Sequence, residues 1–220
     1  MPKLLIKFPT RNRPDKFKKV LQLYIDNLSG LNDVKFVITM DEDDLTMNNE
    51  DIRSWLNSLS VPLKYNYGYS KNKIQAVNAD MENETFDVLL VASDDMIPQV
   101  KNYDSIIFEE YAKHFPNFDG AIKFNDGLRN DELMTLCVMG EPLYRQFGYI
   151  YHPEYTSVYS DTEQTIVFKK MNKFAICDKC IIRHEWTHLP WDELHARNEN
   201  AGMYEVDKKV FERHMKELFT

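Results

Sequence analysis

The chain has 220 residues, of which 43% are hydrophobic, and it carries a formal net charge of −8 at pH 7. This length predicts one domain with a substantial core, and the acidic balance argues against a protein that binds nucleic acid nonspecifically through a broad basic surface. No apolar run is long enough for a transmembrane segment, residues 1–10 lack the features of a signal peptide, and the 3 cysteines make no disulfide framework, so the sequence predicts a cytoplasmic protein.

The first 98 residues alternate short apolar runs with amphipathic segments. The runs predict strands over Lys3–Phe8, Val34–Met40, Leu63–Tyr67 and Val88–Ala92. Between them, apolar residues at helical spacing predict helices over Pro14–Leu28, Asp51–Leu59 and Ser70–Met81, the last capped by Ser70. This order predicts an α/β fold with a mainly parallel central sheet flanked by helices, whose strands end at one edge.

A polar loop of Thr10, Arg11, Asn12 and Arg13 follows the first predicted strand. Parallel α/β sheets bind ligands where a strand hands over to a helix, and a pair of arginines suits a phosphate or a polar base. The alternative is a helix cap with two solvated arginines. The loop is therefore a candidate ligand site that depends on what else lies at the same edge.

The buried strand over Val88–Ala92 ends on Ser93, Asp94 and Asp95. Adjacent carboxylates repel each other unless a cation or a hydrogen-bond donor lies between them, so this pair suggests a hard divalent metal. A solvated turn is the alternative, because aspartates shortly before a proline are common in turns. The second predicted strand also ends in acidic residues, over 41–44.

The pattern is less regular after Pro98. Apolar runs predict strands over Ala121–Phe124, Leu133–Met139 and Phe174–Ile182. Helical spacing predicts helices over Tyr103–Phe115, Glu141–Gly148, Asp161–Asn172 and Val206–Phe219, and the tyrosine-rich stretch Tyr149–Tyr159 predicts a loop.

Four features, in this order along the chain, resemble the GT-A fold glycosyltransferases, particularly the large family-2 group. They are Pro9–Arg13 after a strand, Asp41 after a strand, Ser93–Asp95 at the end of the central strand and Asp161–Glu163 at the start of a late helix. The resemblance covers roughly residues 3–190. It implies a metal-dependent enzyme that moves a sugar from a nucleoside-diphosphate sugar, most often a UDP-sugar, to a hydroxyl group with inversion. The acceptor stays open between a glycan, a lipid, a protein and a modified nucleic acid.

The resemblance also implies how the single domain over residues 1–220 is divided. Residues up to about 98 would bind the nucleotide, and residues from about 99 would form the acceptor half and the C-terminal helix. The residues that would bind the nucleotide sugar share a place at the carboxyl edge of the sheet. They are Thr10, Arg11, Arg13, Asp41, Lys71 or Lys73, and Asp94. Of these, Asp41 would accept a hydrogen bond from an N–H group of the base.

The metal and the catalytic base are implied in the same way. Asp95 would be the direct ligand of Mn²⁺ or Mg²⁺, Asp94 would contact the ribose or the metal, and His184 would be a late ligand. The usual family triplet is Asp-x-Asp, and this chain departs from it in the first acidic position. Asp161, or else Glu163, would be the base that deprotonates the acceptor, although an aspartate there can also be a plain helix N-cap.

His184, Glu185 and His188 match H-E-x-x-H, the zinc-peptidase signature. This alternative requires a helix, because only a spacing of i and i+4 on one helix face directs both imidazoles to one zinc ion. A strand is predicted just before the motif and Pro190 follows it, so the context argues against a helix there. The two histidines can also be ordinary hydrogen-bonded loop residues.

Two further alternatives stay open. Cys177 and Cys180 could join His184 and His188 around zinc, although their spacing is shorter than in a zinc finger. The chain could also be a noncatalytic nucleotide-binding module that keeps the pocket without a working base.

Overall fold

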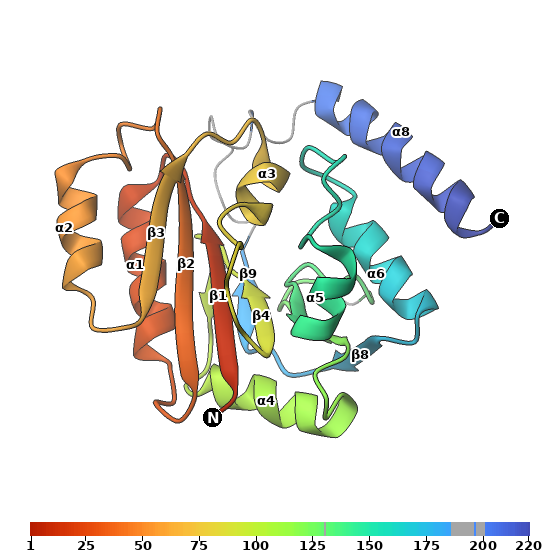
Figure 1. Cartoon of the computed structure of the whole chain (residues 1–220), viewed down its shortest axis with the longest axis horizontal. Helices are drawn as coiled ribbons and strands as arrows, with labels where there is room; N and C mark the ends of the chain where they lie inside the picture. The colour runs from red at the N-terminus through yellow and green to blue at the C-terminus, as the bar shows by residue number, and fades with distance from the viewer. Residues whose placement is uncertain (130, 186–195, 197–200) are drawn as a thin grey trace.

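A mixed sheet lies at the centre of the computed structural model, which describes residues 1–129, 131–185, 196 and 201–220 (Figure 1). Within these residues the sheet has 7 strands. In spatial order they are β3 (Leu63–Gly68), β2 (Asp33–Asp41), β1 (Lys3–Pro9), β4 (Val88–Val91), β7 (Val138–Gly140), β6 (Ala121–Phe124) and β8 (Phe174–Cys177). A second, two-stranded sheet consists of β5 (Met96–Pro98) and β9 (Ile182–His184).

The first four strands, β1 to β4, are all parallel to one another. β1 pairs with both β2 and β4, and β2 pairs with β3. β7 runs antiparallel to β4 and β6, and β8 runs parallel to β6. The prediction of a mainly parallel central sheet is confirmed, and the loops after β1, β2, β3 and β4 meet at one edge, as parallel strands require.

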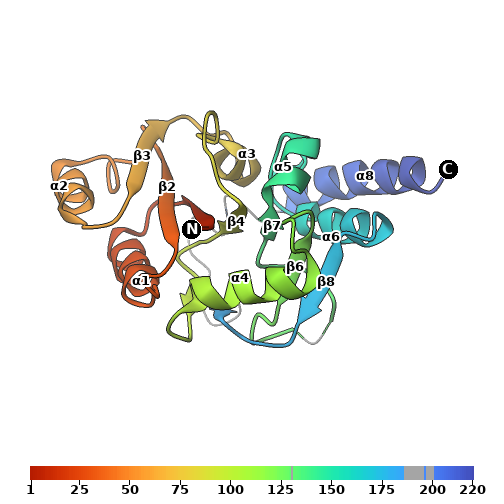
Figure 2. The same ribbon diagram turned by 60° about the horizontal axis from the view of Figure 1, so that its bottom comes forward.

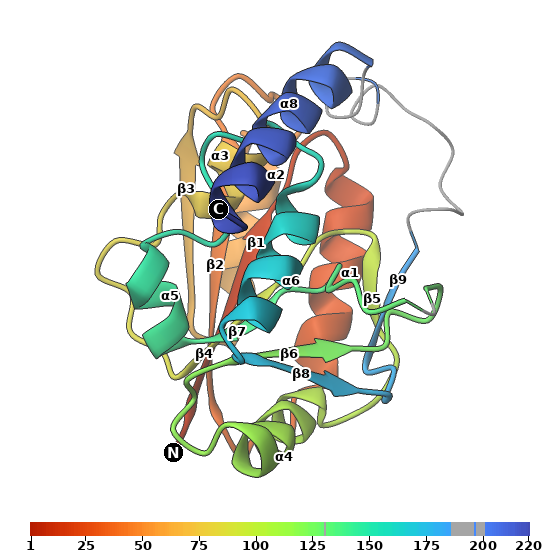
Figure 3. The ribbon, with the colours of Figure 1, turned by 90° about the vertical axis from the view of Figure 1, so that its right-hand side faces the viewer.

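Helices cover both faces of the sheet (Figure 2). They are α1 (Pro14–Asp26), α2 (Glu50–Ser58), α3 (Lys73–Asn78), α4 (Tyr103–His114), α5 (Glu141–Phe147), α6 (Ser160–Lys170) and α8 (Ala201–Leu218). α1, α2 and α4 bury apolar residues against the face of β1 that carries Leu4, Ile6 and Phe8. α3, α5 and α6 pack on the opposite face with Leu5 and Leu89, and α8 lies across the outside of α6 (Figure 3). Of the described helices, none is long and apolar enough to cross a membrane.

The prediction of a strand over Leu133–Met139 is wrong in its first part, because β7 begins only at Val138. The preceding apolar residues form a buried loop instead. The Met134 N–H donates to the Thr165 side chain at 3.1 Å, and the Cys137 carbonyl accepts from the Val91 N–H at 2.9 Å. These contacts place the loop between α6 and β4, which explains why its residues are apolar although they form no strand.

The predicted strand over Phe174–Ile182 is two strands in different sheets. β8 ends at Cys177, and the chain then crosses to β5, where the Ile181 carbonyl accepts from the Gln99 N–H at 2.9 Å. β9 pairs antiparallel with β5 in the register of Met96 with His184. This crossing brings the end of β9 back to the loop that follows β4.

The third helix is shorter than predicted and has another cap. Asn72 caps α3, because its side chain accepts from the Gln75 N–H at 2.9 Å. Ser70, the predicted cap, lies before the helix, and its N–H donates to Asp41 at 3.0 Å.

Candidate functional site

A cleft of about 560 Å³ opens at the edge where the parallel strands end. One side, which we call the strand-end wall, consists of lining residues at or just after the ends of β1, β2 and β4. They are Thr10, Arg11, Arg13, Asp41, Ser93, Asp94 and Asp95. The other side, which we call the loop wall, consists of Ser157–Thr162 and Tyr204, and Lys73, Arg129 and His184 also line the cleft.

Salt bridges connect the loops of the strand-end wall. Arg11 donates to Asp41 at 2.7 Å and to both carboxylate oxygens of Asp43 at 2.5 and 3.0 Å. The other oxygen of Asp41 accepts the Ser70 N–H, so this buried carboxylate joins the loops after β1, β2 and β3. The guanidinium of Arg11 is therefore held by carboxylates, and its contribution to the cleft is to fix the position of the wall.

Asp94 is buried and lies next to two cations. Arg13 donates to one of its oxygens at 3.1 Å, and the ammonium group of Lys16 lies 3.8 Å from the same oxygen. Burial raises the pKa of Asp94, and the charges of Arg13 and Lys16 act in the opposite direction. The predicted arginine pair of the first loop thus faces acidic partners within the wall.

Asp95 lies beside the imidazole that β9 brings back to this edge. The Nε2 atom of His184 is 3.7 Å from one oxygen of Asp95, and the Ser93 hydroxyl donates to the other. Burial alone would raise the pKa of Asp95, but the neighbouring His184 and Ser93 hold it well below its usual range. The positive charge of Lys73 acts in the same direction.

This pair fits a divalent cation. A carboxylate held ionised beside an imidazole is a donor set that Mn²⁺ or Mg²⁺ accepts when phosphate oxygens complete the coordination. Two buried polar atoms at the same edge lack hydrogen-bond partners among the described residues, the Thr10 hydroxyl and Nδ1 of His184. Both atoms belong to residues that line the cleft, so they are available to a bound group.

Asp161 lies in the loop wall, in the first turn of α6. It is not the N-cap, because Tyr159 holds that position with a left-handed backbone, φ 61°. One carboxylate oxygen of Asp161 accepts the Thr162 N–H at 2.8 Å. Within the described part of the chain no hydrogen bond joins its second oxygen, so Asp161 offers a free acceptor to the cleft.

Two predicted site residues do not line the cleft. Lys71 is exposed before α3. Glu163 lies on the other side of α6, where it accepts a hydrogen bond from Tyr155 and lies 2.8 Å from Nδ1 of His214. Successive residues of a helix are turned by about 100°, so positions 161 and 163 point in nearly opposite directions and only one of them can face the cleft.

Asp207 of α8 is a functional candidate that the sequence did not indicate. Its fully buried carboxylate accepts hydrogen bonds from the Thr156 N–H at 2.8 Å and from the Thr156 hydroxyl at 2.9 Å. It also accepts from the N–H groups of Ser157 at 2.8 Å and Val158 at 2.9 Å. Asp207 therefore holds the loop wall in place, and the only sequence signal was an acidic residue early in an amphipathic helix.

The aromatic contacts of α8 support the same arrangement. Tyr204 packs edge-to-face on Tyr159 at 5.3 Å between ring centroids, and Phe211 stacks on Tyr159 at 5.2 Å. Arg129, whose guanidinium pairs with Asp131, also reaches the cleft. None of these contacts follows from local sequence pattern.

The described part of the zinc-peptidase motif is not helical. His184 is the last residue of β9, so the backbone at the start of the motif is extended rather than helical. His188 lies outside the described residues. Cys177 is buried at the end of β8 and Cys180 is partly buried, and within the described ranges they form no three-residue ligand group with His184.

Comparisons with known proteins show the fold. No family model matches the chain, and no curated protein matches it in sequence. A mannosyltransferase from Pyrobaculum calidifontis, PcManGT, solved with GDP-Man and Mn²⁺, is similar at TM-score 0.68 and 16% identity. The match covers 89% of this chain and 59% of that protein, so the chain spans less than two thirds of it.

Two further structures agree. TarS residues 1–349 from S. aureus, solved with UDP-GlcNAc, is similar at TM-score 0.64 and 12% identity over 97% of this chain and 73% of its own. Glucosyl-3-phosphoglycerate synthase from Mycobacterium tuberculosis was solved with Mn²⁺, UDP and phosphoglyceric acid. It is similar at TM-score 0.62 and 12% identity, over 96% of this chain and 78% of its own. The chain therefore has the GT-A fold of these glycosyltransferases, as its sequence predicts.

Proposed function

We propose that the protein is a metal-dependent glycosyltransferase that moves a sugar from a nucleoside-diphosphate sugar to a hydroxyl acceptor. The observation that carries the proposal is the cleft itself. The pair of Asp95 and His184 and the open carboxylate of Asp161 line one cavity, at the strand edge of a fold whose solved examples hold GDP-Man or UDP-GlcNAc. UDP-sugars are the first donors to test, and GDP-mannose is the second.

In this proposal the residues up to about 98 bind the donor. The Thr10 hydroxyl and the Lys73 ammonium group face the nucleotide and its phosphates, and Asp41 orders the loops around the base. Asp95 and His184 would hold Mn²⁺ or Mg²⁺, with Asp94 beside them. When bound, the ion stabilises the negative charge that develops on the departing diphosphate.

The residues after about 98 supply the acceptor side. Asp161 accepts the proton of the acceptor hydroxyl as that oxygen attacks the anomeric carbon, and attack from the side opposite the diphosphate inverts the configuration. Tyr151, Tyr159 and Tyr204 line the cleft, and Tyr204, which is half-exposed, is the aromatic side chain we propose to contact a sugar ring. The acceptor is a glycan, a lipid, a protein or a modified nucleic acid.

Thermal melting with nucleotides tests the donor and metal assignment. A ligand that binds only the folded state raises the melting temperature, by roughly 5–10 °C at a hundredfold excess over Kd. We expect this shift with a UDP-sugar or GDP-mannose, only when Mn²⁺ is present, and we expect Asp95→Ala to abolish it. Asp33→Ala is the control, because it removes an exposed carboxylate at the opposite end of β2.

Three outcomes contradict the proposal. One is no shift with any nucleotide sugar. The second is a shift that Asp95→Ala leaves unchanged. The third is a nucleotide-dependent shift in a protein that neither transfers nor hydrolyses any donor, which is the result expected of a noncatalytic nucleotide-binding module.

A further inference from the structure

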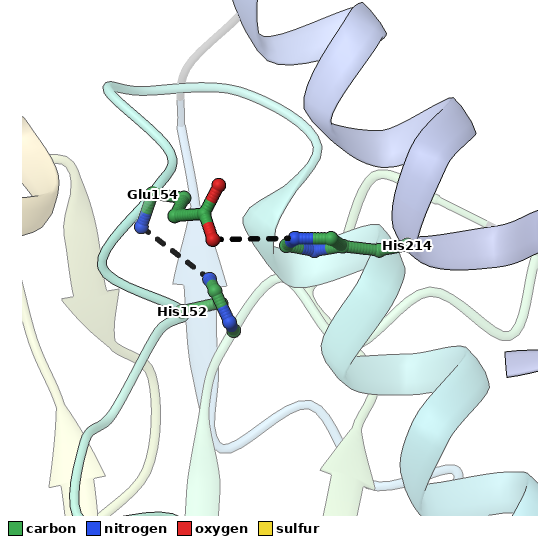
Figure 4. A group of neighbouring side chains, drawn as sticks. All are labelled: His152, Glu154 and His214. Carbon is green, nitrogen blue, oxygen red and sulfur yellow. Dashed lines mark hydrogen bonds and ion pairs between the residues drawn. The ribbon is translucent and has the colours of Figure 1, made fainter. Parts of the chain in front are cut away.

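A second cluster of candidate metal ligands lies outside the lining of the cleft (Figure 4). His152 and Glu154 come from the loop between α5 and α6, and His214 comes from α8. Among the described residues, these form the one group of three histidine, cysteine or acidic side chains whose ligand atoms all lie within 4.8 Å of one another. The two imidazole rings are 4.4 Å apart between centroids.

The neighbours of the cluster orient His214 as metal-binding histidines are oriented. Its Nδ1 atom lies 2.8 Å from a carboxylate oxygen of Glu163, which also accepts a hydrogen bond from Tyr155. This leaves Nε2 directed at Glu154, whose nearer oxygen is 3.8 Å away. Metal-bound histidines typically donate their second nitrogen to a carboxylate, and Glu163 holds that position here.

His152 presents the other ring nitrogen to the cluster. Its Nδ1 atom accepts the Glu154 N–H at 3.3 Å, so the lone pair of the neutral ring lies on the side of Glu154 and the ring proton is on Nε2 (Figure 4). His152 and Glu163 also line a small cavity of about 30 Å³, enough for one water molecule.

Arg213 now occupies the place that a metal would take. Its guanidinium pairs with Glu154 and lies 3.1 Å from Nε2 of His214. The Arg213 side chain is 51% exposed, so it can turn into solvent at small cost. Without it, the carboxylates of Glu154 and Glu163 leave the cluster with a net negative charge.

We propose that His152, Glu154 and His214 form a binding site for Zn²⁺, separate from the cleft, which the Arg213 guanidinium occupies when the metal is absent. Two imidazoles and one carboxylate are a common zinc ligand set, with water in the fourth position. The ion would join α8 to the loop before α6. It would thereby hold the helix that supplies Asp207 and Tyr204 to the loop wall.

Zn²⁺ titration of the chelator-treated full chain tests this site, with Co²⁺ absorption as the readout of its ligands. We expect one Zn²⁺ to bind, and we expect Glu154→Gln and His214→Ala each to weaken binding by at least about tenfold. Arg213→Gln removes the competing cation, so it should tighten binding and raise the melting temperature further when Zn²⁺ is added. A variant that folds poorly would bind Zn²⁺ more weakly, so tighter binding by Arg213→Gln cannot result from a loss of folding.

Two controls separate this site from other zinc ligands. His114→Ala removes a histidine of α4 that lies 3.8 Å from Glu110, and it should leave Zn²⁺ binding unchanged. Asp95→Ala disrupts the cleft and should also leave it unchanged, so this proposal and the proposed function fail separately. The proposal is overturned if no Zn²⁺ binds, if binding survives the loss of both His152 and His214, or if Arg213→Gln weakens it.

Discussion

The two walls of the cleft are built in different ways. Each part of the strand-end wall lies at or just after the end of a parallel strand, so the sheet brings Thr10, Asp41 and Asp95 to one edge. The loop wall lies between α5 and α6 and at the start of α6 rather than at the end of a described strand, and a carboxylate 51 residues further along the chain, Asp207, holds it to α8. The first wall is therefore a product of the sheet, whereas the second depends on long-range contacts with α8.

The joint between the halves should be the most sensitive position. Gly140 ends β7, the strand that attaches the second half to β4, and a Cβ atom there would lie 1.5 Å from the Phe118 carbonyl oxygen. Because the obstacle is backbone, we expect Gly140→Ala to lower the free energy of unfolding by more than about 3 kcal/mol. Urea unfolding measures it, with Gly68→Ala as the control, since no atom lies within 4 Å of a Cβ there. Equal losses in both variants would contradict the prediction.

Asp161→Asn should affect the reaction without affecting the donor. Removing the general base from the loop wall is expected to lower the transfer rate at least about 100-fold, or about 2.7 kcal/mol in the barrier. The Mn²⁺-dependent melting shift with donor should persist, because the strand-end wall is intact. Glu163→Gln changes the other predicted base on the same helix, and it should retain far more of the transfer rate than Asp161→Asn, because Glu163 does not line the cleft. Turnover of Asp161→Asn near the parental rate would exclude Asp161 as the base.

Asp207→Asn tests whether the loop wall depends on its anchor. The amide keeps one acceptor oxygen and places donors against N–H groups, so we expect a loss of about 2 kcal/mol in unfolding free energy. Transfer should fall while donor binding is kept. The matched control is Asp104→Asn, which changes another buried carboxylate, one that accepts from Ser29 and Asn32 away from the cleft. If Asp104→Asn reduces transfer equally, the effect is one of general stability.

The smallest expected effect concerns a buried lysine beneath the strand-end wall. Lys7 is fully buried, donates to Thr39 and to the Ala79 carbonyl, and burial lowers its pKa to about 8 from 10.5. Between these two values the unfolded chain binds more protons than the folded one, so the contribution of Lys7 to stability rises with pH. The rise should be about 1 kcal/mol from pH 7 to 9.

Urea unfolding at several pH values measures this term as the difference between the parental protein and Lys7→Met. The variant should lack the rise. A difference that stays constant or decreases from pH 7 to 9 would show that Lys7 is not perturbed in the folded state.

The difference between the walls also explains what the sequence could predict. The strands of the first half follow from apolar runs, and their polar ends share an edge because parallel strands must end together. Ser93–Asp95 and Thr10–Arg13 could therefore be assigned to one site without a structure. His184 also lines that site, but only because β9 crosses to β5, and the sequence instead predicts a continuous strand over Phe174–Ile182.

The loop wall could be predicted only in part, because its determinants are long-range. The start of a predicted helix made both Asp161 and Glu163 candidates for the catalytic base. Only the structure shows which face of α6 lines the cleft, and so which of the two residues lies there. Asp207 and Arg129 carry no local pattern that marks them, since a buried carboxylate and a surface aspartate look alike in sequence. Leu133–Cys137 has the composition of a strand and folds as a buried loop for the same reason.

The anchor at Asp207 has a consequence for the order in which the molecule is made. Contacts between residues far apart in the chain form late in folding, because they must first close a long loop. A growing polypeptide can complete the strand-end wall once β4 has left the ribosome, but the loop wall waits until α8 has been synthesised and has docked. In the proposed transferase, a growing chain without α8 would hold its donor without using it, so the docking of α8 sets the time at which activity begins.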